Sequence, residues 1–131
     1  DLLSYLYPIS ELSKFGIPLS FSSDSPVIPP DPWCGIYSAV TGLSKDGKSV
    51  TASGDVMMRQ GITLEEALKA YSYGGAFAEG TEGLKGHIRA GQLADIILIQ
   101  TNPMDLDPKD WLETEALLTI IGGKIVWEKP V

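Results

Sequence analysis

The stretch "ISELSKFGIPLSFSSD", residues 9–24, sets the fold class that this chain predicts. Residues 9–15 predict a short helix with Ser10 as its N-cap. Gly16 follows as the residue after the helix, because glycine adopts the left-handed conformation at low cost. The apolar run over residues 17–23 then predicts a buried strand with a proline near its start. Helix, glycine and buried strand in this order are typical of an α/β fold.

Asp24 lies where the predicted strand ends and a proline-rich stretch begins. Residues 24–33, "DSPVIPPDPW", contain four prolines and predict a stiff, extended loop. An acidic residue at this place can cap a helix, close a turn or serve as a catalytic carboxylate. The local sequence favours a turn or a cap, because Asp side chains commonly accept hydrogen bonds from nearby backbone.

The following segments predict two helices separated by a loop. Residues 33–43 carry apolar side chains at helical spacing, and residues 44–55 are polar and glycine-rich, which indicates an exposed loop. Thr63 and Glu66 have the spacing of a capping box at the start of an amphipathic helix. The glycine pair at 74–75 either ends this helix or lets it approach another backbone closely.

The last third of the chain, after about residue 83, predicts β-structure. A turn leads into a strand over residues 94–100. A short helical turn follows, with Asp107 as its cap and a proline at its first position. Residues 117–128 predict a hairpin, because two β runs are joined by a Gly-Gly pair.

The composition excludes several classes of partner. The chain has 131 residues, of which 44% are apolar and 21% charged, as in an ordinary globular domain. Its net charge of −7 argues against nucleic acid and against an anionic membrane surface, because phosphate binding needs a basic stripe. The longest apolar runs are too short to cross a bilayer.

The chain contains one cysteine, Cys34, and one histidine, His87. An internal disulfide is therefore impossible, which fits a reducing compartment, and we expect a cytoplasmic protein. A zinc or two-metal site usually needs several His or Cys ligands, which this chain cannot supply alone. Cys34 lies in an apolar helical pattern with no histidine placed to activate it. A buried structural thiol is therefore favoured over a nucleophile.

Four segments, taken in order, resemble the C-terminal part of metal-dependent amidohydrolases. They are "GIPLSFSSDSPVIPPDPWCGIYSAVTG", "TLEEALKAYSYGGAFA", "KGHIRAGQLADIILI" and "LLTIIGGKIVWE". The third contains the pattern G-x-[IL]-x-x-G-x-x-A-D at residues 86–95. The nearest resemblance is to the amidohydrolase-3 branch, with its YtcJ-like proteins and N-substituted formamide deformylases. The chain also begins without Met and within an amphipathic pattern, so we expect a piece of a longer protein.

This resemblance implies a fold of class α/β. Members look like a TIM-like (β/α)₈ metal-dependent hydrolase barrel with a small composite β-sandwich built from both chain ends. Residues 1–82 would be the last βα units of the barrel, with strand eight at about residues 17–23. Residues 83–131 would be the C-terminal strands of the sandwich. A whole barrel needs about 250 residues, so the chain is expected to be a fragment.

The resemblance also implies a role for Asp24. Family ligands are a His-x-His motif, a Lys or Glu, two later His and an Asp at the end of strand eight, and only the last has a match here. Asp24 would be a metal ligand and catalytic proton shuttle in the hydrolysis of amide or other non-peptide C–N bonds by metal-activated water. The implied cofactor is one or two divalent ions, with Zn²⁺ favoured. The fragment alone is expected to be inactive, and the implied partners are a small amide-type substrate and the missing N-terminal part of the enzyme.

Other polar and aromatic candidates have structural alternatives. Ser23 and Ser25 flank the candidate carboxylate and either orient it or satisfy the turn backbone. Trp33 either lines a substrate pocket or packs in the core. His87, within the tail motif, is favoured as a surface or turn histidine. Asp95 is favoured as a hydrogen-bonding group at a turn or strand edge.

A non-enzymatic function stays open beside the hydrolase. Unpaired edges of the predicted strands "ADIILI" and "IIGGKIVWE" could pair with another chain. The chain would then be an assembly module that pairs with another chain. A fragment is instead expected to aggregate, to pair with its missing half or to swap strands, which gives a homo-oligomer or a strand-swapped dimer.

Overall fold

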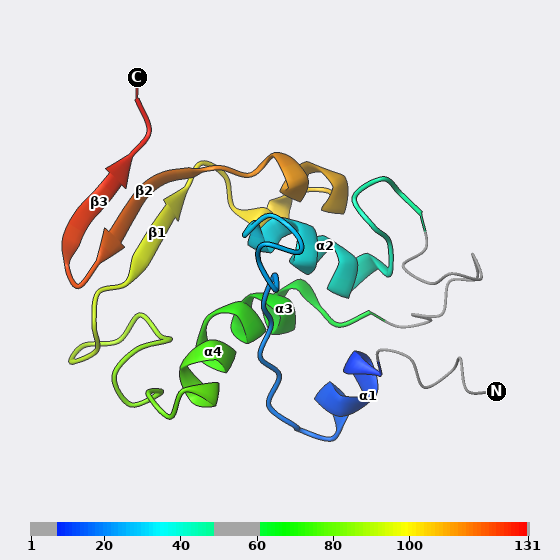
Figure 1. Cartoon of the computed structure of the whole chain (residues 1–131), viewed down its shortest axis with the longest axis horizontal. Helices are drawn as coiled ribbons and strands as arrows, with labels where there is room; N and C mark the ends of the chain where they lie inside the picture. Colours follow the sequence, from blue (N-terminus) through cyan, green and yellow to red (C-terminus); the bar gives the residue numbers. More distant parts are fainter. Residues whose placement is uncertain (1–7, 49–60, 131) are drawn as a thin grey trace.

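The computed structural model describes residues 8–48 and 61–130 of the chain. Within these residues four α-helices come first and a three-stranded antiparallel sheet follows, so the predicted α/β class is confirmed in its content of helices and strands (Figure 1). The elements are α1 (Ile9–Lys14), α2 (Pro32–Thr41), α3 (Leu64–Tyr71), α4 (Tyr73–Ala78), β1 (Ile96–Ile99), η2 (Pro103–Asp105), η3 (Pro108–Glu113), β2 (Ala116–Ile121) and β3 (Lys124–Glu128). None of the described helices has the length and apolar character needed to cross a membrane.

Helix α1 begins earlier than its expected cap. Its N-cap is Pro8, which makes no side-chain capping bond, and the prediction of Ser10 as the cap is wrong. A proline already has a φ close to the helical value, so the helix starts directly after it and Ser10 lies in the first turn. Gly16 follows with φ +71°, and its N–H donates to the Ser13 carbonyl at 2.8 Å, as expected after a helix.

Residues 17–23 do not form the predicted strand. The segment runs past α3 as an irregular trace (Figure 1), and its backbone bonds to helical carbonyls. Ile17 donates to Leu12 at 3.0 Å, and Phe21 donates to Ala70 at 3.2 Å. Ile17 is also 48% exposed, so the expected burial is wrong at this end of the segment. A strand needs a neighbour that completes its ladder of hydrogen bonds, and no described strand runs beside this segment.

The proline-rich stretch after Asp24 turns back on itself, in contrast to the predicted extended loop. Residues 24–27 form a turn in which Val27 N–H donates to the Asp24 carbonyl at 2.9 Å. Asp31 then caps α2 by accepting from Trp33 N–H at 3.0 Å. The predicted helix at 33–43 is confirmed, and of the predicted loop at 44–55 the residues after 48 lie outside the described part.

Helices α2 and α3 form the core of the molecule. Ile36 of α2 is 1% exposed and Ala67 of α3 is 0% exposed. The fully buried side chain of Ile36 contributes about 2 kcal/mol through the apolar surface it removes from water. The buried cluster around them contains Trp33, Ile36, Ala39, Ile62, Leu64, Ala67 and Trp111.

The long helix predicted from Thr63 onward is divided in two. Its capping box is confirmed, since the Thr63 hydroxyl accepts from Glu66 N–H and the Glu66 carboxylate accepts from Thr63 N–H at 2.7 Å. Ser72, with ψ −83°, separates α3 from α4 before the glycine pair is reached. Its hydroxyl donates to the Leu68 carbonyl at 2.8 Å, a back-bond that commonly bends helices.

The sheet is antiparallel with the order β1-β2-β3. The predicted hairpin is confirmed, and its turn residues Gly122 and Gly123 have φ +56° and +78°, which only glycine adopts cheaply. Asp95, just before β1, accepts from Gly122 N–H at 2.7 Å and so ties the first strand to the turn. Asp107 is at the N-cap of η3, as expected, but its side chain makes no capping bond.

The bond between Asp95 and Gly122 predicts a measurable loss of stability. Asp95→Ala should lower the free energy of unfolding by about 1 kcal/mol, because the turn loses its anionic acceptor. Asp95→Asn keeps an oxygen acceptor and should lose less. Asp107→Ala is the control, since this carboxylate makes no capping bond, and it should change stability by under about 0.5 kcal/mol. Urea unfolding measures all three, and equal stabilities for the two Ala variants would contradict the assignment.

Candidate functional site

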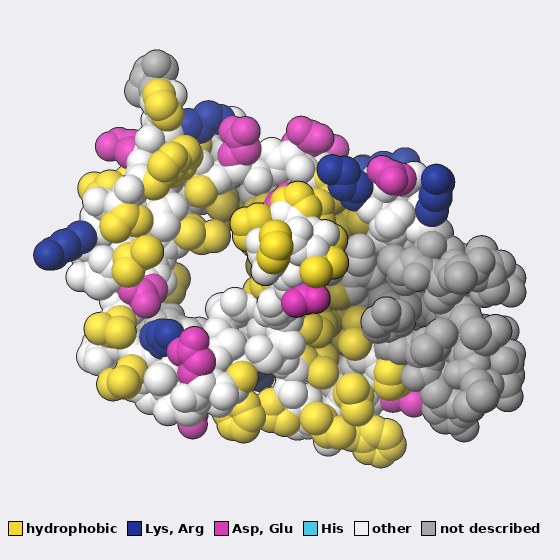
Figure 2. Space-filling view, viewed as in Figure 1, with side chains coloured by type: hydrophobic (Ala, Val, Ile, Leu, Met, Phe, Trp, Pro, Cys, Tyr) yellow, Lys and Arg dark blue, Asp and Glu magenta, His cyan; other side chains and the backbone are white. Residues whose placement is uncertain are grey.

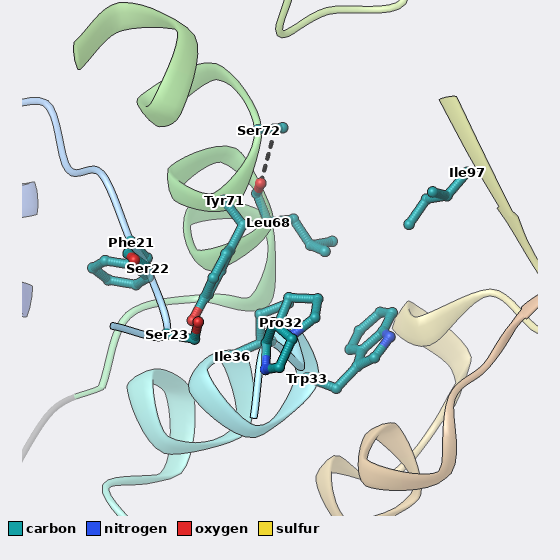
Figure 3. Close-up of a pocket in the computed structure, with 11 residues that line it drawn as sticks. Phe21, Ser22, Ser23, Pro32, Trp33, Ile36, Leu68, Tyr71, Ser72 and Ile97 are labelled. Carbon is teal, nitrogen blue, oxygen red and sulfur yellow. Dashed lines mark hydrogen bonds between the residues drawn. The ribbon is translucent and has the colours of Figure 1, made fainter. Parts of the chain in front are cut away.

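A pocket of about 590 Å³ lies between β1 and the helices α2 and α3. Figure 2 shows an opening between the sheet and the helical part of the molecule, and Figure 3 shows the lining side chains. Most of them are apolar, and the polar ones are serines. The lining residues are Phe21, Ser22, Ser23, Pro30, Pro32, Trp33, Ile36, Leu68, Tyr71, Ser72 and Ile97.

Asp24 directly follows the last pocket residue of the irregular segment, Ser23. It is exposed, and its φ of +54° is in the left-handed region that residues other than glycine rarely occupy. The Ser22 hydroxyl accepts from Asp24 N–H at 3.2 Å. The backbone of Asp24 therefore closes a turn, as the local sequence suggests, and the residue is exposed directly after a residue that lines the pocket.

Tyr71 forms one wall of the pocket. Its ring meets the Phe21 ring edge-on, with centroids 5.7 Å apart (Figure 3). Its hydroxyl fits against α2 where Gly35 has no side chain, since a Cβ there would lie 1.9 Å from that oxygen. Burial raises the pKa of Tyr71, and the Asp31 carboxylate raises it further. The hydroxyl is therefore neutral at ordinary pH.

Asp31 and Cys34 form a polar pair at the start of α2. The Cys34 thiol donates to Asp31 Oδ2 at 3.4 Å, while Asp31 Oδ1 caps the helix. Burial raises the pKa of Cys34, and the hydrogen bond and negative charge of Asp31 raise it further, against a smaller effect of Lys45. Sequence reasoning did not single out Asp31. Its position before Pro32 is the signal that could have found it, because Asp followed by Pro is a common helix start.

The remaining candidates divide between the pocket and distant surfaces. Ser23 and Trp33 line the pocket, and Trp33 is also buried in the core, which confirms its packing role. Ser25 is exposed and is not among the lining residues. His87 is exposed and stacks on the Tyr73 ring at 4.8 Å, in the loop after α4, as expected for a surface histidine.

Asp95 has the structural role that the sequence favours. Its carboxylate accepts from the β2–β3 turn at Gly122, as described above. It is therefore a strand-edge group and is not among the residues that line the pocket.

A metal site of three or more His, Cys, Asp or Glu side chains does not occur within residues 8–48 and 61–130. Asp24 is an exposed carboxylate and so has the donor chemistry that a divalent cation prefers. One carboxylate does not hold such an ion by itself, because a catalytic zinc takes about three protein ligands. The described residues therefore fit a metal only as one contributor to a larger ligand set.

Two known proteins are similar in sequence to nearly the whole of this chain. It is 34% identical over 132 residues to the putative amidohydrolase YtcJ of Bacillus subtilis (strain 168), covering 98% of this chain and 24% of that protein. It is 26% identical over 125 residues to the N-substituted formamide deformylase of Arthrobacter pascens, covering 95% of this chain and 22% of that protein. The chain therefore spans about a quarter of the length of these relatives.

The fold also has a counterpart among solved structures. The crystal structure of an amidohydrolase from Thermotoga maritima MSB8 matches with a TM-score of 0.66 at 23% identity, over 92% of this chain and 26% of that one. A family profile described as the amidohydrolase family matches residues 2–127. Since this match spans nearly the whole sequence, the chain belongs to the amidohydrolase family.

Proposed function

We propose that the protein to which this chain belongs hydrolyses amide-type or other non-peptide C–N bonds in small molecules. The observation that carries the proposal is the family match over residues 2–127. One relative is named for deformylating N-substituted formamides, and this name supports small N-substituted amides as the substrate class. Because the chain spans about a quarter of its relatives, the complete activity belongs to the longer protein.

We place this chain at the end of a (β/α)₈ barrel, followed by sandwich strands from about residue 83. Residues 17–23 would be strand eight of that barrel. The likeness to the Thermotoga maritima amidohydrolase, of which the chain matches 26%, supports a place within a larger amidohydrolase fold. One side of the segment packs on helices through Phe21, while Ile17 remains 48% exposed. We propose that neighbouring strands from the rest of the protein cover the exposed side and complete its ladder.

Asp24 is the group of this chain that we propose for the chemistry. It would hold a divalent metal, Zn²⁺ being the expected one, together with ligands from the rest of the protein. Such a metal, when bound, makes water a strong nucleophile at neutral pH. The exposed Asp24 carboxylate would accept the proton of that water and return it to the leaving nitrogen. The strained turn around Asp24 supports this role, because strained backbone is common at catalytic sites.

Cys34 does not fit the alternative role of a covalent nucleophile. A nucleophilic thiol needs a lowered pKa or an adjacent base, whereas burial and Asp31 raise the pKa of Cys34. The histidine of the chain, His87, stacks on Tyr73 in another part of the molecule. The thiol therefore remains protonated at neutral pH, and metal-assisted hydrolysis is the reaction class that we favour.

Replacement of Asp24 tests the proposed chemistry. Asp24→Asn in the whole protein should lower kcat for N-substituted formamides and related small amides by about 10²–10⁴-fold, because the amide cannot accept the proton. Circular dichroism should be unchanged, since Asn also tolerates the left-handed turn. Asp107→Asn, a surface carboxylate without a capping bond, is the matched control. Wild-type kcat in the Asp24 variant would refute the role.

The environment of Cys34 predicts how fast it is alkylated. At pH 8 the rate should rise several-fold in Asp31→Asn, because removing the negative charge lowers the pKa and enlarges the thiolate fraction. Asn caps helices as well as Asp does, so α2 should remain intact. Lys45→Gln should slow the reaction, since Lys45 opposes the rise in pKa. Rates measured with iodoacetamide across pH 7–10 decide this, and a slower Asp31→Asn reaction would contradict it.

An assembly module remains the second candidate function, and one observation favours it. The edge strands β1 and β3 expose large apolar side chains, among them Ile97, Ile125 and Trp127, which are 56%, 61% and 44% exposed. Exposed apolar surface of this kind usually has a covering partner. In the hydrolase, that cover would be the rest of the same enzyme.

The behaviour of the 131-residue chain on its own separates the two candidates. If the chain is a part of a larger enzyme, the isolated chain should self-associate on size-exclusion chromatography, because its sheet is uncovered. It should also pair with the remaining part of the enzyme when the two are mixed. A monomer that unfolds cooperatively, without metal or activity, would instead favour an independent module. Multi-angle light scattering and urea unfolding give the two measurements.

A further inference from the structure

Helix α4 contacts the irregular segment, residues 17–23, at Gly74. This segment leads directly to Asp24. A Cβ on Gly74 would lie 2.0 Å from the carbonyl oxygen of Leu19 and 3.2 Å from the Cα of Ser20, the first of which is far inside contact distance. Gly74 is buried. The absence of a side chain at Gly74 therefore allows the helix and the segment to lie this close together. Of the two roles that the sequence leaves open for the glycine pair, ending the helix or allowing a close backbone approach, Gly74 has the second.

Two further contacts hold the segment on the same helices. Phe21 N–H donates to the Ala70 carbonyl at 3.2 Å, and the Phe21 ring packs edge-on against Tyr71. Tyr71 is held in turn, because its hydroxyl occupies the space that a side chain at Gly35 would fill. The segment is thus located by backbone and ring contacts on helices that belong to the core.

The short connection from this contact to Asp24 leaves little freedom to absorb a shift. Asp24 follows Leu19 by five residues. Its own backbone is held on both sides, by the Ser22 hydroxyl at 3.2 Å and by Val27 N–H at 2.9 Å. The left-handed φ of Asp24 is uncommon outside glycine, and these two hydrogen bonds fix it. A displacement of the Leu19 carbonyl would therefore move the carboxylate.

We propose that Gly74 is a positioning residue for Asp24, an inference that rests on the proposed function of that carboxylate. Gly74 sets the depth at which the segment rests on α4, and so where the carboxylate stands relative to ligands and substrate from the rest of the protein. Displacing a catalytic group by about 1 Å can lower a rate by about 10²-fold, so a single methyl group at this contact is enough to be measured.

The test compares two adjacent glycines of α4 in the whole protein. Gly74→Ala should lower kcat by about 10–100-fold with little change in KM, and should weaken Zn²⁺ binding to the metal-free protein in calorimetry. Gly75→Ala adds the same methyl group where nothing lies within 4 Å, and should match the wild type in both measurements. A folded Gly74→Ala protein with wild-type kcat and Zn²⁺ affinity would overturn the proposal.

A second pair of variants separates position from stability. Gly123 lies in the hairpin turn, away from α4, with φ +78° and nothing within 4 Å of a Cβ. Gly123→Ala should therefore lower the free energy of unfolding through backbone strain while leaving kcat and Zn²⁺ affinity unchanged, and an equal loss of kcat would overturn the proposal. Where Gly74→Ala does not fold, Phe21→Leu takes its place, since it loosens the same segment. It should lower kcat and Zn²⁺ affinity several-fold, and wild-type values would overturn the proposal.

Asp24→Asn keeps the failure of this inference distinct from the failure of the proposed function. An inactive Asp24→Asn protein beside a fully active Gly74→Ala protein overturns the positioning role alone. An active Asp24→Asn protein overturns the role of the carboxylate and this inference together.

Discussion

The packing of α2 against α3 is the contact on which the other elements depend. Ile36 and Ala67 meet there with almost no exposure. Trp111 of η3 belongs to the same cluster, and side chains from three other parts of the described chain pack against it: Ile9 of α1, Leu19 and Phe21 of the irregular segment, and Ile99 of β1. Removing this contact would leave the candidate carboxylate, the pocket and the sheet without a common support.

Polar groups secure the same arrangement from outside the core. The Ser13 hydroxyl donates to the Glu66 carboxylate, which joins α1 to the start of α3. This bond, and the Thr63 backbone bond after it, lower the pKa of Glu66, so the link is strongest in the charged form. On the other side of the core, the Trp111 indole donates to the Pro103 carbonyl at 2.9 Å and orders the connection between β1 and β2. These two bonds thus join segments that lie on opposite sides of the core cluster.

Features with local causes could be predicted from the sequence. The capping box at Thr63 and the Gly122-Gly123 hairpin depend on side chains a few residues apart, and both are present. The position of Asp95 just before a strand predicts a structural hydrogen-bonding role, and its carboxylate accepts a hydrogen bond from Gly122 N–H. The break at Ser72 was missed because the apolar period continues through it, while its hydroxyl back-bonds to Leu68.

Features that need a distant partner could not be predicted in the same way. Residues 17–23 have the composition of a buried strand, but strand structure requires a neighbouring backbone, and the partner here is the carbonyl end of α3. Phe21 and Tyr71 form one wall of the pocket, and the Tyr71 hydroxyl fits there only because Gly35 has no side chain. These three residues come from three separate segments of the chain.

The sequence by itself determined the capping box at Thr63, the hairpin turn and the family, because the first two depend on short-range patterns and the third on the order of segments. It also singled out Asp24, by resemblance. Only the tertiary structure decided which glycine of the pair at 74–75 allows a close approach and that Asp24 lies in a left-handed turn directly after a residue that lines a pocket. The physical reason is that contact between backbones distant in sequence depends on how whole helices pack, and no local preference of a residue encodes it.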